Sequence, residues 1–391
     1  MPAPGLGAAI VNMRVLHVVR PAAGGMVRHL ELLLPRLAGA VLGPARADLG
    51  PAGAGLELLV AAPADLADRL MDIQTPAIQF SPLPWSGPLW RRPWLVPGLR
   101  RRLRAIVEAF QPDVVHLHGL EAALLALPVL VRDTTRSGGR PGVCVTLHNA
   151  LPALPRQTPG WLLRRLEQAD ALIMVSPAMS FPSPKAIFIP NGIDLAENPP
   201  EPFGPAAGPL RVAVLSRLSR EKGLDLIAPA LRGWNQQERP LEIRIAGDGP
   251  LLNRLRNEME RSRLGDMVHF LGFLPPPAVR RLLAWSELLL LPSRSEGLPL
   301  AVLEAMAAAR PVIATRVGGL PWLVNAGAGW LIEPNCPAAL REALVEAWAR
   351  RHELETMGQR ARQRVAVGYN VDEMVARTLA VYRALQTGEP G

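Results

Sequence analysis

Cysteine is almost absent from this chain of 391 residues, in which Cys144 and Cys336 are the only two. Two cysteines cannot form a disulfide framework or a cysteine-based zinc site, so we expect a reducing compartment, the cytoplasm. Long apolar runs are also missing, because the run from Ala122 to Val131 is too short to span a bilayer and is interrupted by a proline. The first residues lack the pattern of a signal peptide, and Met13 is an alternative start to Met1.

Two motifs that would indicate particular chemistry are missing as well. No Asp-x-Asp pair occurs, and no carboxylate stands near the strand-end histidines at the spacing of metal ligands. No Gly-x-Gly-x-x-Gly follows the first expected strand. We therefore predict a site without a metal or a cofactor, and we do not expect hydride transfer with a dinucleotide.

Lysine is the rare cation of this sequence. The chain has 43 basic and 34 acidic residues, a net charge of +9, which indicates an anionic partner without identifying it. Lys185 and Lys222 are the only lysines, so arginine fills the ordinary basic positions. A compact ammonium on a flexible stem suits contact with a phosphate, and this makes Lys222 a candidate for such a contact.

Apolar, β-branched stretches alternate with helical patterns along the chain, which is typical of doubly wound parallel sheets. The first half has expected strands at Arg14–Val19, Leu56–Ala61, Ala77–Phe80, Val114–Leu117, Val143–Leu147 and Ala171–Val175. A proline-rich stretch from Pro182 to Pro209 is the expected linker. The second half has expected strands at Leu210–Leu215, Leu241–Ala246, Val268–Leu271, Glu287–Leu291 and Pro311–Ala314, and an expected helix from about Glu221. The sequence thus predicts an α/β fold with two similar domains that face each other across a cleft.

Strand-to-helix loops of the second half contain charged residues and glycines. The loop from Ser216 to Gly223 contains Arg217 and Lys222, which could clamp a diphosphate. Gly247 and Gly249 form another such turn, for which a purely structural role is an equal alternative.

A third loop of the second half ends in two glutamates. Glu296 lies just before an expected helix opened by Pro299, and Glu304 lies inside that helix. The free N–H groups of Gly297 and Leu298 at the helix start suit an anionic or polyhydroxylated ligand. The alternative is that both glutamates are simply solvated.

The first half offers a glycine loop and three histidines at strand ends. Gly24 and Gly25 could admit a diphosphate against the backbone, or they form a plain tight turn. His116, His118 and His148 stand at or just past the carboxyl ends of expected strands, the edge where ligands bind in open α/β sheets, so we expect them to face a crevice. The alternative is that each holds a backbone carbonyl.

Tryptophan and arginine are interleaved between Leu83 and Val107, a stretch with no acidic residue. Such a composition suits the surface of an anionic membrane, and the candidates for that contact are Trp90, Trp94, Arg100, Arg101 and Arg102. A solvated basic helix flank is the alternative. No nucleic-acid-binding module is recognisable, so we expect no nucleic acid partner.

Five motifs taken together resemble a known family. They are Gly24-Gly25-Met-Val-Arg-His29, Pro190-Asn-Gly-Ile-Asp194, Arg217-Leu-Ser-Arg-Glu-Lys-Gly223, Gly247-Asp-Gly-Pro250 and the pair Glu296 and Glu304. In this order, between about Met13 and Tyr382, they resemble the family 4 retaining glycosyltransferases of group 1, which have the GT-B fold of two Rossmann-like domains. The resemblance implies transfer of a sugar from a nucleoside diphosphate sugar to a hydroxyl acceptor, with retention and without a metal.

The resemblance also implies roles for single residues. Arg217 and Lys222 would hold the diphosphate, and Glu304 would bind the ribose. Glu296 would lie by the donor sugar and His148 would border the reacting centre. The first glycine loop, with Gly24 and Gly25, would close on the donor, to which Gly247, Gly249, Gly297 and Leu298 would also contribute. The segment from Asn149 to Trp161 is poor in polar residues for an acceptor, which is a departure from the family pattern.

The expected domains are an acceptor-binding domain at 1–195, a nucleotide-sugar-binding domain at 196–370 and a C-terminal helix at 371–391 that packs back on the first domain. The expected acceptor is a sugar or a lipid-linked sugar, such as a precursor of a surface polysaccharide, used in the cytoplasm or at the inner face of its membrane. Two alternatives remain: a nucleotide-sugar epimerase of the same fold and a non-catalytic nucleotide-sugar-binding protein.

Overall fold

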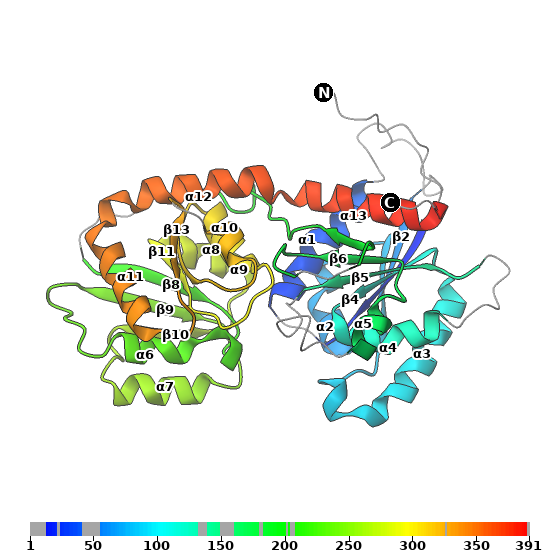
Figure 1. The fold of residues 1–391 in the computed structure, drawn as a ribbon, viewed down its shortest axis with the longest axis horizontal. Coiled ribbons are helices and arrows are strands. Elements are labelled where there is room, and N and C mark those ends of the chain that lie inside the picture. The colour runs from blue at the N-terminus through cyan, green and yellow to red at the C-terminus, as the bar shows by residue number, and fades with distance from the viewer. Residues whose placement is uncertain are drawn as a thin grey trace.

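The computed structural model of the chain describes residues 13–21, 24–40, 55–131, 139–148, 160–179, 183–200, 202–203, 208–324 and 327–388. They form two α/β domains side by side, as the ribbon in Figure 1 shows. The fold predicted from the sequence, two Rossmann-like domains, is confirmed. Most of the acceptor segment predicted between Asn149 and Trp161 lies outside the described residues.

The N-terminal domain is built on a seven-stranded sheet with the order β3-β2-β1-β4-β5-β6-β7, and all its neighbouring strands are parallel. Helices cover the faces of this sheet, so its central strands have no exposed side and their sequences are nearly unbroken apolar runs. Every residue of β4, for example, is buried. The strands are β1 (Met13–Val19), β2 (Leu56–Pro63), β3 (Ile78–Leu83), β4 (Val114–His118), β5 (Gly142–Leu147), β6 (Ala171–Met174) and β7 (Ala186–Phe188).

The C-terminal domain repeats this plan with a six-stranded parallel sheet in the order β10-β9-β8-β11-β12-β13. Its strands are β8 (Leu210–Leu215), β9 (Leu241–Ala246), β10 (Val268–Gly272), β11 (Leu288–Leu291), β12 (Val312–Thr315) and β13 (Gly329–Ile332). When the strands of each domain are numbered by their order in the chain, both sheets contain the arrangement 3-2-1-4-5-6, which is the doubly wound order of Rossmann folds. The first sheet adds β7 after it.

Helices connect the strands and cover the sheets. The N-terminal domain has α1 (Gly25–Ala40), α2 (Ala64–Arg69), α3 (Val96–Phe110), α4 (Leu120–Leu130), α5 (Gly160–Leu166) and the 3₁₀ turns η1 (Met71–Ile73), η2 (Leu89–Arg91) and η3 (Pro93–Leu95). The C-terminal domain has α6 (Ile227–Ala230), α7 (Leu252–Arg261), α8 (Pro276–Trp285), α9 (Leu300–Ala307), α10 (Leu320–Leu323), α11 (Pro337–Ala349), α12 (Leu354–Gly368) and the 3₁₀ turns η4 (Arg220–Lys222), η5 (Leu224–Leu226) and η6 (Arg351–Glu353).

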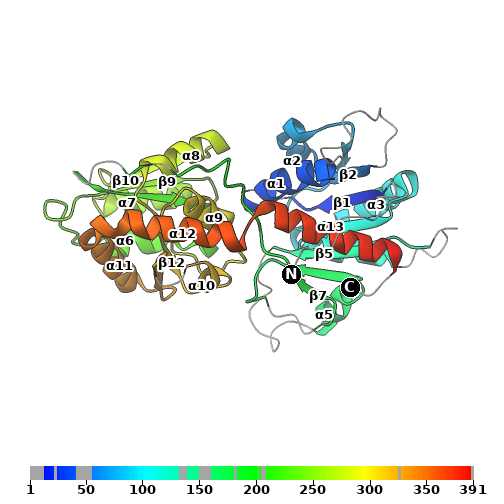
Figure 2. The ribbon, with the colours of Figure 1, turned by 90° about the horizontal axis from the view of Figure 1, so that it is seen from above.

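The last helix, α13 (Val371–Thr387), crosses from the C-terminal to the N-terminal domain and packs on α1, β4 and β5. Figures 1 and 2 show α12 and α13 running one after the other along one face of both domains. At the crossing point the chain passes very close to Gly192, where a Cβ would overlap Val371. The N–H of Ile193 donates to the carbonyl of Tyr369, and the carbonyl of Ile193 accepts from the N–H of Val371. These contacts hold the two domains together at the crossing.

Three sequence-based expectations were wrong in detail. The stretch expected as a linker begins by forming β7, the edge strand of the first sheet, which is too short for an alternation pattern to be visible. The edge strand β13 was missed for the same reason. The helix expected from Glu221 is replaced by η4, η5 and the short α6, because Gly223 has a left-handed φ of 67° and interrupts helical geometry. No helix among the described residues has the length and apolar character that crossing a membrane requires.

Candidate active site

Both sheets reverse their strand order at one point, and in α/β folds ligands bind beside that point at the carboxyl ends of the strands. The reversal lies between β1 and β4 in the first sheet and between β8 and β11 in the second. The loops after β8 and β11 contain Arg217, Lys222 and Glu296, and the residues after β1 include Arg20. The topology therefore gathers these charged residues where a ligand of two linked parts would bind.

Lys222 and Glu296 form an ion pair between the loops that follow β8 and β11. The ammonium Nζ of Lys222 lies 2.7 Å from Oε1 of Glu296, and the hydroxyl of Ser293 donates to the same oxygen at 2.6 Å. Ser293 and Glu296 are buried, whereas Lys222 is partly exposed. A buried carboxylate is costly unless it is paired, so these two donors fix Glu296 in place.

Arg217 and Arg20 bring positive charge to the site from the two domains. Arg217 is exposed after β8, and Arg20 is partly buried after β1. The pKa of Arg20 is lowered, mainly by burial; Glu121 opposes the shift and the nearby charge of Arg217 adds to it. Two guanidinium groups that feel each other's charge favour an anion between them, and a diphosphate has the charge for that place.

Glycines let the loops of the C-terminal domain approach one another closely. A Cβ on Gly247 would overlap the carbonyl oxygen of Ser216, and one on Gly249 would overlap that of Leu218. Both glycines have φ values, 137° and 158°, that L side chains rarely adopt. Their structural role is thus visible: they place the turn after β9 directly against the loop that contains Arg217.

Gly297 lies where the two domains touch. A Cβ at this position would overlap the backbone carbonyl oxygen of His148, which follows β5 of the other domain. The neighbouring carbonyl of Leu298 accepts a hydrogen bond from Asn191 Nδ2 at 2.8 Å. Asn191 belongs to the Pro190–Asp194 motif, which thus helps to hold the loop before α9 against the N-terminal domain.

Glu304, on α9, faces the N-terminal domain as well. Its Oε1 lies 3.4 Å from Nε of Arg28 on α1, and Arg28 also pairs with Glu197 and, at 3.3 Å, with Glu31. The pKa of Glu304 is raised to about 7, chiefly by burial, although Arg28 opposes the rise. A carboxyl group that is about half protonated at pH 7 can donate a hydrogen bond in its protonated form and accept one in either form, as binding to a hydroxyl requires.

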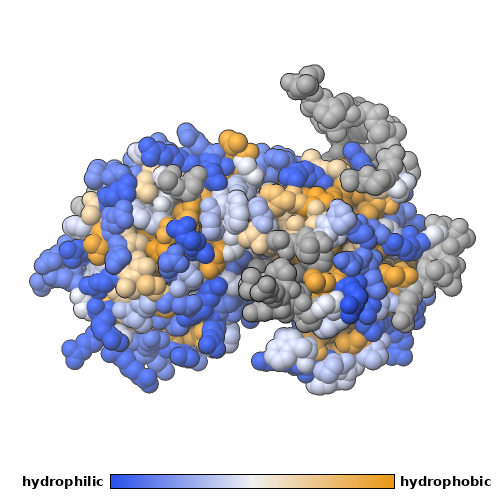
Figure 3. Space-filling model, viewed as in Figure 1, coloured by the Kyte–Doolittle hydropathy of each residue, from blue (hydrophilic) through white to orange (hydrophobic). Residues whose placement is uncertain are grey.

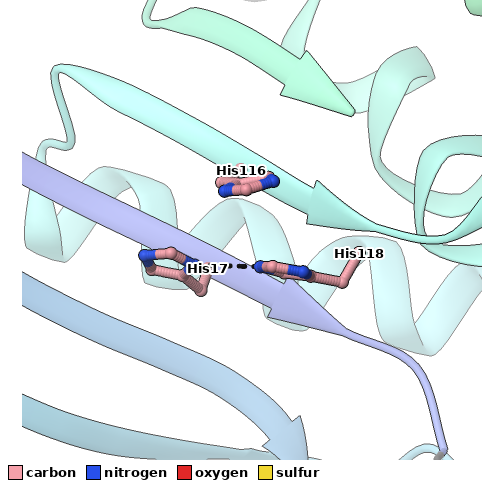
Figure 4. A group of neighbouring side chains, drawn as sticks. All are labelled: His17, His116 and His118. Atoms are coloured by element: carbon pink, nitrogen blue, oxygen red, sulfur yellow. Dashed lines mark hydrogen bonds between the residues drawn. The ribbon is translucent and has the colours of Figure 1, made fainter. Parts of the chain in front are cut away.

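Five of the seven histidines form one connected cluster, made of His17, His29, His116, His118 and His148. Figure 4 shows three of them, with His17 Nδ1 bonded to His118 Nε2 at 3.0 Å and His116 beside the pair. His118 Nδ1 in turn lies 3.3 Å from His148 Nε2. His116 bonds Tyr382 of α13 at 2.5 Å and Thr146 of β5 at 2.6 Å.

Four of the five rings, all but that of His148, are buried. Burial lowers the pKa values of these rings, to about 3 for His17 and about 4 for His29. The expectation that all the strand-end histidines face a crevice is wrong for His116 and His118, which are at most 1% exposed. Tyr382 of α13 and Thr146 of β5 contact His116, and His17 of β1 contacts His118. His148 is partly exposed and lies at the edge of the site.

The first glycine loop is open. Gly24 and Gly25 are exposed, and a Cβ on either would meet nothing within 4 Å among the described residues. Gly24 has a φ of 64°, which accounts for a glycine there, and its carbonyl accepts the first bond of α1 from Arg28 at 3.1 Å. The loop thus leads directly into the helix that supplies Arg28 and His29.

The interleaved aromatic and basic residues belong to η2, η3 and α3 of the N-terminal domain. Trp90 and Trp94 are 72% and 70% exposed, and Arg101 and Arg102 are exposed on α3. Arg100 is different, because its guanidinium donates to the carbonyl oxygens of Leu124 and Leu125 on α4. Arg100 therefore braces two helices instead of facing outwards.

Sequence reasoning missed four residues of the site: Arg20, Arg28, Asn191 and Ser293. For Arg20 a signal was present, since it follows β1 immediately, one position closer to its strand than Arg217 is to β8. Arg28 and Asn191 stood inside recognised motifs but act across the domain boundary, which only the folded arrangement reveals.

Comparison with known proteins agrees with this architecture. Residues 23–197 match the model of "Glycosyltransferase Family 4", and residues 197–364 match that of "Glycosyl transferases group 1". The putative colanic acid biosynthesis glycosyltransferase WcaL of Escherichia coli is 34% identical over 210 residues, 52% of each chain. The matched segment thus spans about half the length of this curated relative. Glycogen synthase of Mycobacterium tuberculosis is 27% identical over 75% of this chain and 73% of its own.

A solved structure shares the fold. The crystal structure of Anabaena Alr3699/HepE in complex with UDP superposes with a TM-score of 0.72, at 19% identity, over 95% of this chain and 100% of that one. The two family models adjoin at residue 197 and together extend from 23 to 364. With both halves matched in the expected order on a GT-B fold, the chain belongs to the family 4, group 1 glycosyltransferases.

Proposed function

We propose that this protein transfers a sugar from a nucleoside diphosphate sugar to a hydroxyl acceptor, with retention of anomeric configuration and without a metal in the donor site. The observation that carries this proposal is the pair of Lys222 and Glu296 at the reversal point of the second sheet, beside Arg217. It supplies fixed positive charge and a fixed carboxylate where a donor would bind.

The charges match the demands of the reaction. Breaking the anomeric bond leaves negative charge on the diphosphate and positive charge on the sugar ring. Arg217 and Lys222 would stabilise the diphosphate, with Arg20 contributing from the other domain. In the proposed course the acceptor hydroxyl attacks from the face on which the diphosphate departs, and a diphosphate oxygen takes its proton. The new glycosidic bond forms as the old one breaks.

The remaining residues would orient the donor. Glu304, whose carboxyl is half protonated near pH 7, would bind the ribose hydroxyls. Glu296 would bond to the sugar once the diphosphate draws Lys222 towards itself. His148 would border the reacting centre at the edge of the N-terminal domain, with the open loop of Gly24 and Gly25 opposite.

A uridine diphosphate sugar is the first donor to test, because the structural neighbour Alr3699/HepE was crystallised with UDP. The likeness to a colanic acid glycosyltransferase supports a sugar or lipid-linked sugar of a surface polysaccharide as the acceptor. For such an acceptor we propose action in the cytoplasm, at the inner face of the membrane. There the exposed Trp90, Trp94, Arg101 and Arg102 would contact anionic headgroups.

The test is incubation of the purified protein with a panel of uridine, guanosine and adenosine diphosphate sugars. Release of nucleoside diphosphate that depends on an added acceptor is the expected result, and product anomers assigned by proton NMR should keep the donor's configuration. EDTA should not lower the rate. Interconversion of the donor sugar alone would indicate an epimerase, and binding without turnover would indicate a non-catalytic protein; either result would overturn the proposal.

A further inference from the structure

The histidine cluster contains more than the proposed transfer uses. Of its five rings only His148 lies at the edge of the donor site. His29, His118 and His148 come from α1, the end of β4 and the end of β5, and each can direct one ring nitrogen to a common point, with the three nitrogens within 4.8 Å of one another. Three histidines from three elements that converge in this way are an arrangement typical of a transition-metal site.

The hydrogen bonds around His29 show which of its ring nitrogens carries the hydrogen and which has the free lone pair. Asn191 donates its amide nitrogen to the carbonyl of Leu298, which leaves its Oδ1 as an acceptor. His29 Nδ1, 3.1 Å from that oxygen, must therefore carry the hydrogen. In a neutral imidazole with its hydrogen on Nδ1, the lone pair is on Nε2, and this atom is buried without a hydrogen-bond partner among the described residues. Such an orphan acceptor costs free energy unless something binds it.

The other two rings are spaced for coordination. His118 Nδ1 lies 3.3 Å from His148 Nε2. Two nitrogens on a tetrahedral zinc ion, each about 2.0–2.1 Å from the metal, are separated by about 3.3 Å. Two neutral imidazoles at this distance can share a hydrogen, or each can offer a lone pair to an ion between them.

We propose that His29 Nε2, His118 Nδ1 and His148 Nε2 form a binding site for a zinc-like divalent cation. Two of the three ligands also have partners that fix the ring, as metal-binding histidines require. Asn191 accepts from the far nitrogen of His29, and His17 Nδ1 lies 3.0 Å from the far nitrogen of His118. His148 is partly exposed, which gives an ion a route to the site.

The neighbouring trio of His17, His116 and His118, drawn in Figure 4, is a poorer candidate. Both nitrogens of His116 are occupied, one by Tyr382 and the other by Thr146. An ion there would have to break those bonds, and all three rings are at most 1% exposed. We therefore assign this trio a supporting role, in which His17 orients His118 and His116 ties α13 to the sheet.

The proposed ion would inhibit transfer, and this consequence alone rests on the proposed function. The ion would coordinate the ring of His148, which we place beside the reacting centre, and it would link α1 to the ends of β4 and β5. The helix that supplies Arg28 and follows the first glycine loop would then be held in one position. Zinc would thus lower turnover, whereas removal of all metal would not.

The experiment measures binding first, so that its outcome does not depend on activity. The full chain, freed of metal, is dialysed against ZnCl₂ and its zinc content is determined, and CoCl₂ is used as a spectroscopic probe of coordination. We expect one tightly bound ion per chain and an intense visible absorption typical of tetrahedral cobalt. His29→Ala and His148→Ala should each weaken binding by more than about 100-fold, and Asn191→Ala by about 10–100-fold, since it removes only a supporting contact.

His352→Ala is the matched control, because His352 lies outside the cluster and its side chain is 79% exposed. It should bind zinc like the unaltered protein. Circular dichroism must show that each variant is folded, and the two ligand variants are independent in case one is not. Absence of bound zinc in the unaltered protein would overturn the proposal, as would undiminished binding in folded His29→Ala and His148→Ala.

Discussion

Arg28 of the N-terminal domain reaches the C-terminal domain at Glu304, with Nε and Oε1 3.4 Å apart. Arg28 lies on α1, the helix that follows the first glycine loop, and Glu304 has the carboxyl group that we propose as the ligand of the ribose. The same guanidinium also contacts Glu197 and Glu31, so three carboxyl groups share one cation. Burial is the main reason why the pKa of Glu304 is raised, and the negative charges of Glu31 and Glu197 add to the rise.

The first prediction concerns stability and pH. The folded-state pKa of Glu304, about 7, lies above its ordinary value of 4.5, so between these values the folded protein binds more protons than the unfolded one. A rise in pH through this window therefore lowers the free energy of unfolding. In the unaltered protein the free energy of unfolding should fall by on the order of 2–3 kcal/mol between pH 5 and pH 8, and in Glu304→Gln this fall should be absent. Urea unfolding of both proteins measures the difference. An identical pH dependence in the two would contradict the assignment.

The second prediction separates charge from shape at Lys222. Lys222→Ala should lower kcat by about 10²–10³, because it removes a cation that stabilises the leaving diphosphate. Lys222→Arg keeps the charge and should retain part of the activity, although a planar guanidinium cannot reproduce the single bond to Glu296. Steady-state kinetics with a saturating acceptor measures both. Wild-type rates in Lys222→Ala would remove this residue from the site.

The positions of the proposed donor-binding residues could be predicted from the sequence better than their contacts. Arg217, Lys222 and Glu296 lie in the segments that follow β8 and β11, and a parallel sheet brings the ends of its strands to one edge whatever the packing. Short edge strands escaped prediction because three or four half-buried residues show no period. The contact of Arg28 with Glu304 depends on how the two domains meet, which no local pattern encodes.

The histidine cluster shows the same limit. His17 lies opposite His116, and Val19 opposite His118, only because β1 and β4 pair in parallel with that register. The two strands are separated by almost a hundred residues in the chain. The sequence revealed histidines at the strand ends but not that His17 and His29 would join them.

The third prediction tests Arg20, the cation that sequence reasoning missed. Arg20→Gln should raise KM for the donor about tenfold, since loss of roughly 1.5 kcal/mol is typical for a charged hydrogen bond to a ligand. The proximity of its charge to that of Arg217 is the reason for expecting an anion there. Arg261→Gln, an exposed position on α7, serves as the control and should leave KM unchanged. Equal KM values in the two variants would show that Arg20 does not contact the donor.

The fourth prediction concerns the meeting point of the domains. Gly297→Ala places a methyl group on the carbonyl oxygen of His148, so the domains cannot approach as closely as they do here. We expect a higher KM for the donor and a lower kcat, with little change in the unfolding of either domain. Gly265→Ala is the matched control, because a Cβ at Gly265 would meet no atom of the described residues within 4 Å. Unaltered kinetics in Gly297→Ala would mean that this contact is not needed during turnover.

The fifth prediction tests the membrane surface, and the structure refines which residues to change. Because Arg100 is bonded to α4, it should be left intact, and Arg101 and Arg102 should both be replaced by serine. Each basic residue near an anionic surface contributes about 1 kcal/mol, so the double variant should bind phosphatidylserine vesicles about 30-fold more weakly in sedimentation. Replacing the exposed Trp90 and Trp94 by serine should weaken binding further by removing the interfacial rings.

The control for this experiment removes the same charge elsewhere. Arg254 and Arg261 are exposed on α7 of the C-terminal domain, and changing both to serine lowers the net charge by the same two units as the α3 variant. If the membrane is held by the α3 surface, the α7 variant should sediment with vesicles like the unaltered protein. If both variants lose binding equally, the interaction follows from net charge alone, and the residues around α3 are then an ordinary solvated surface.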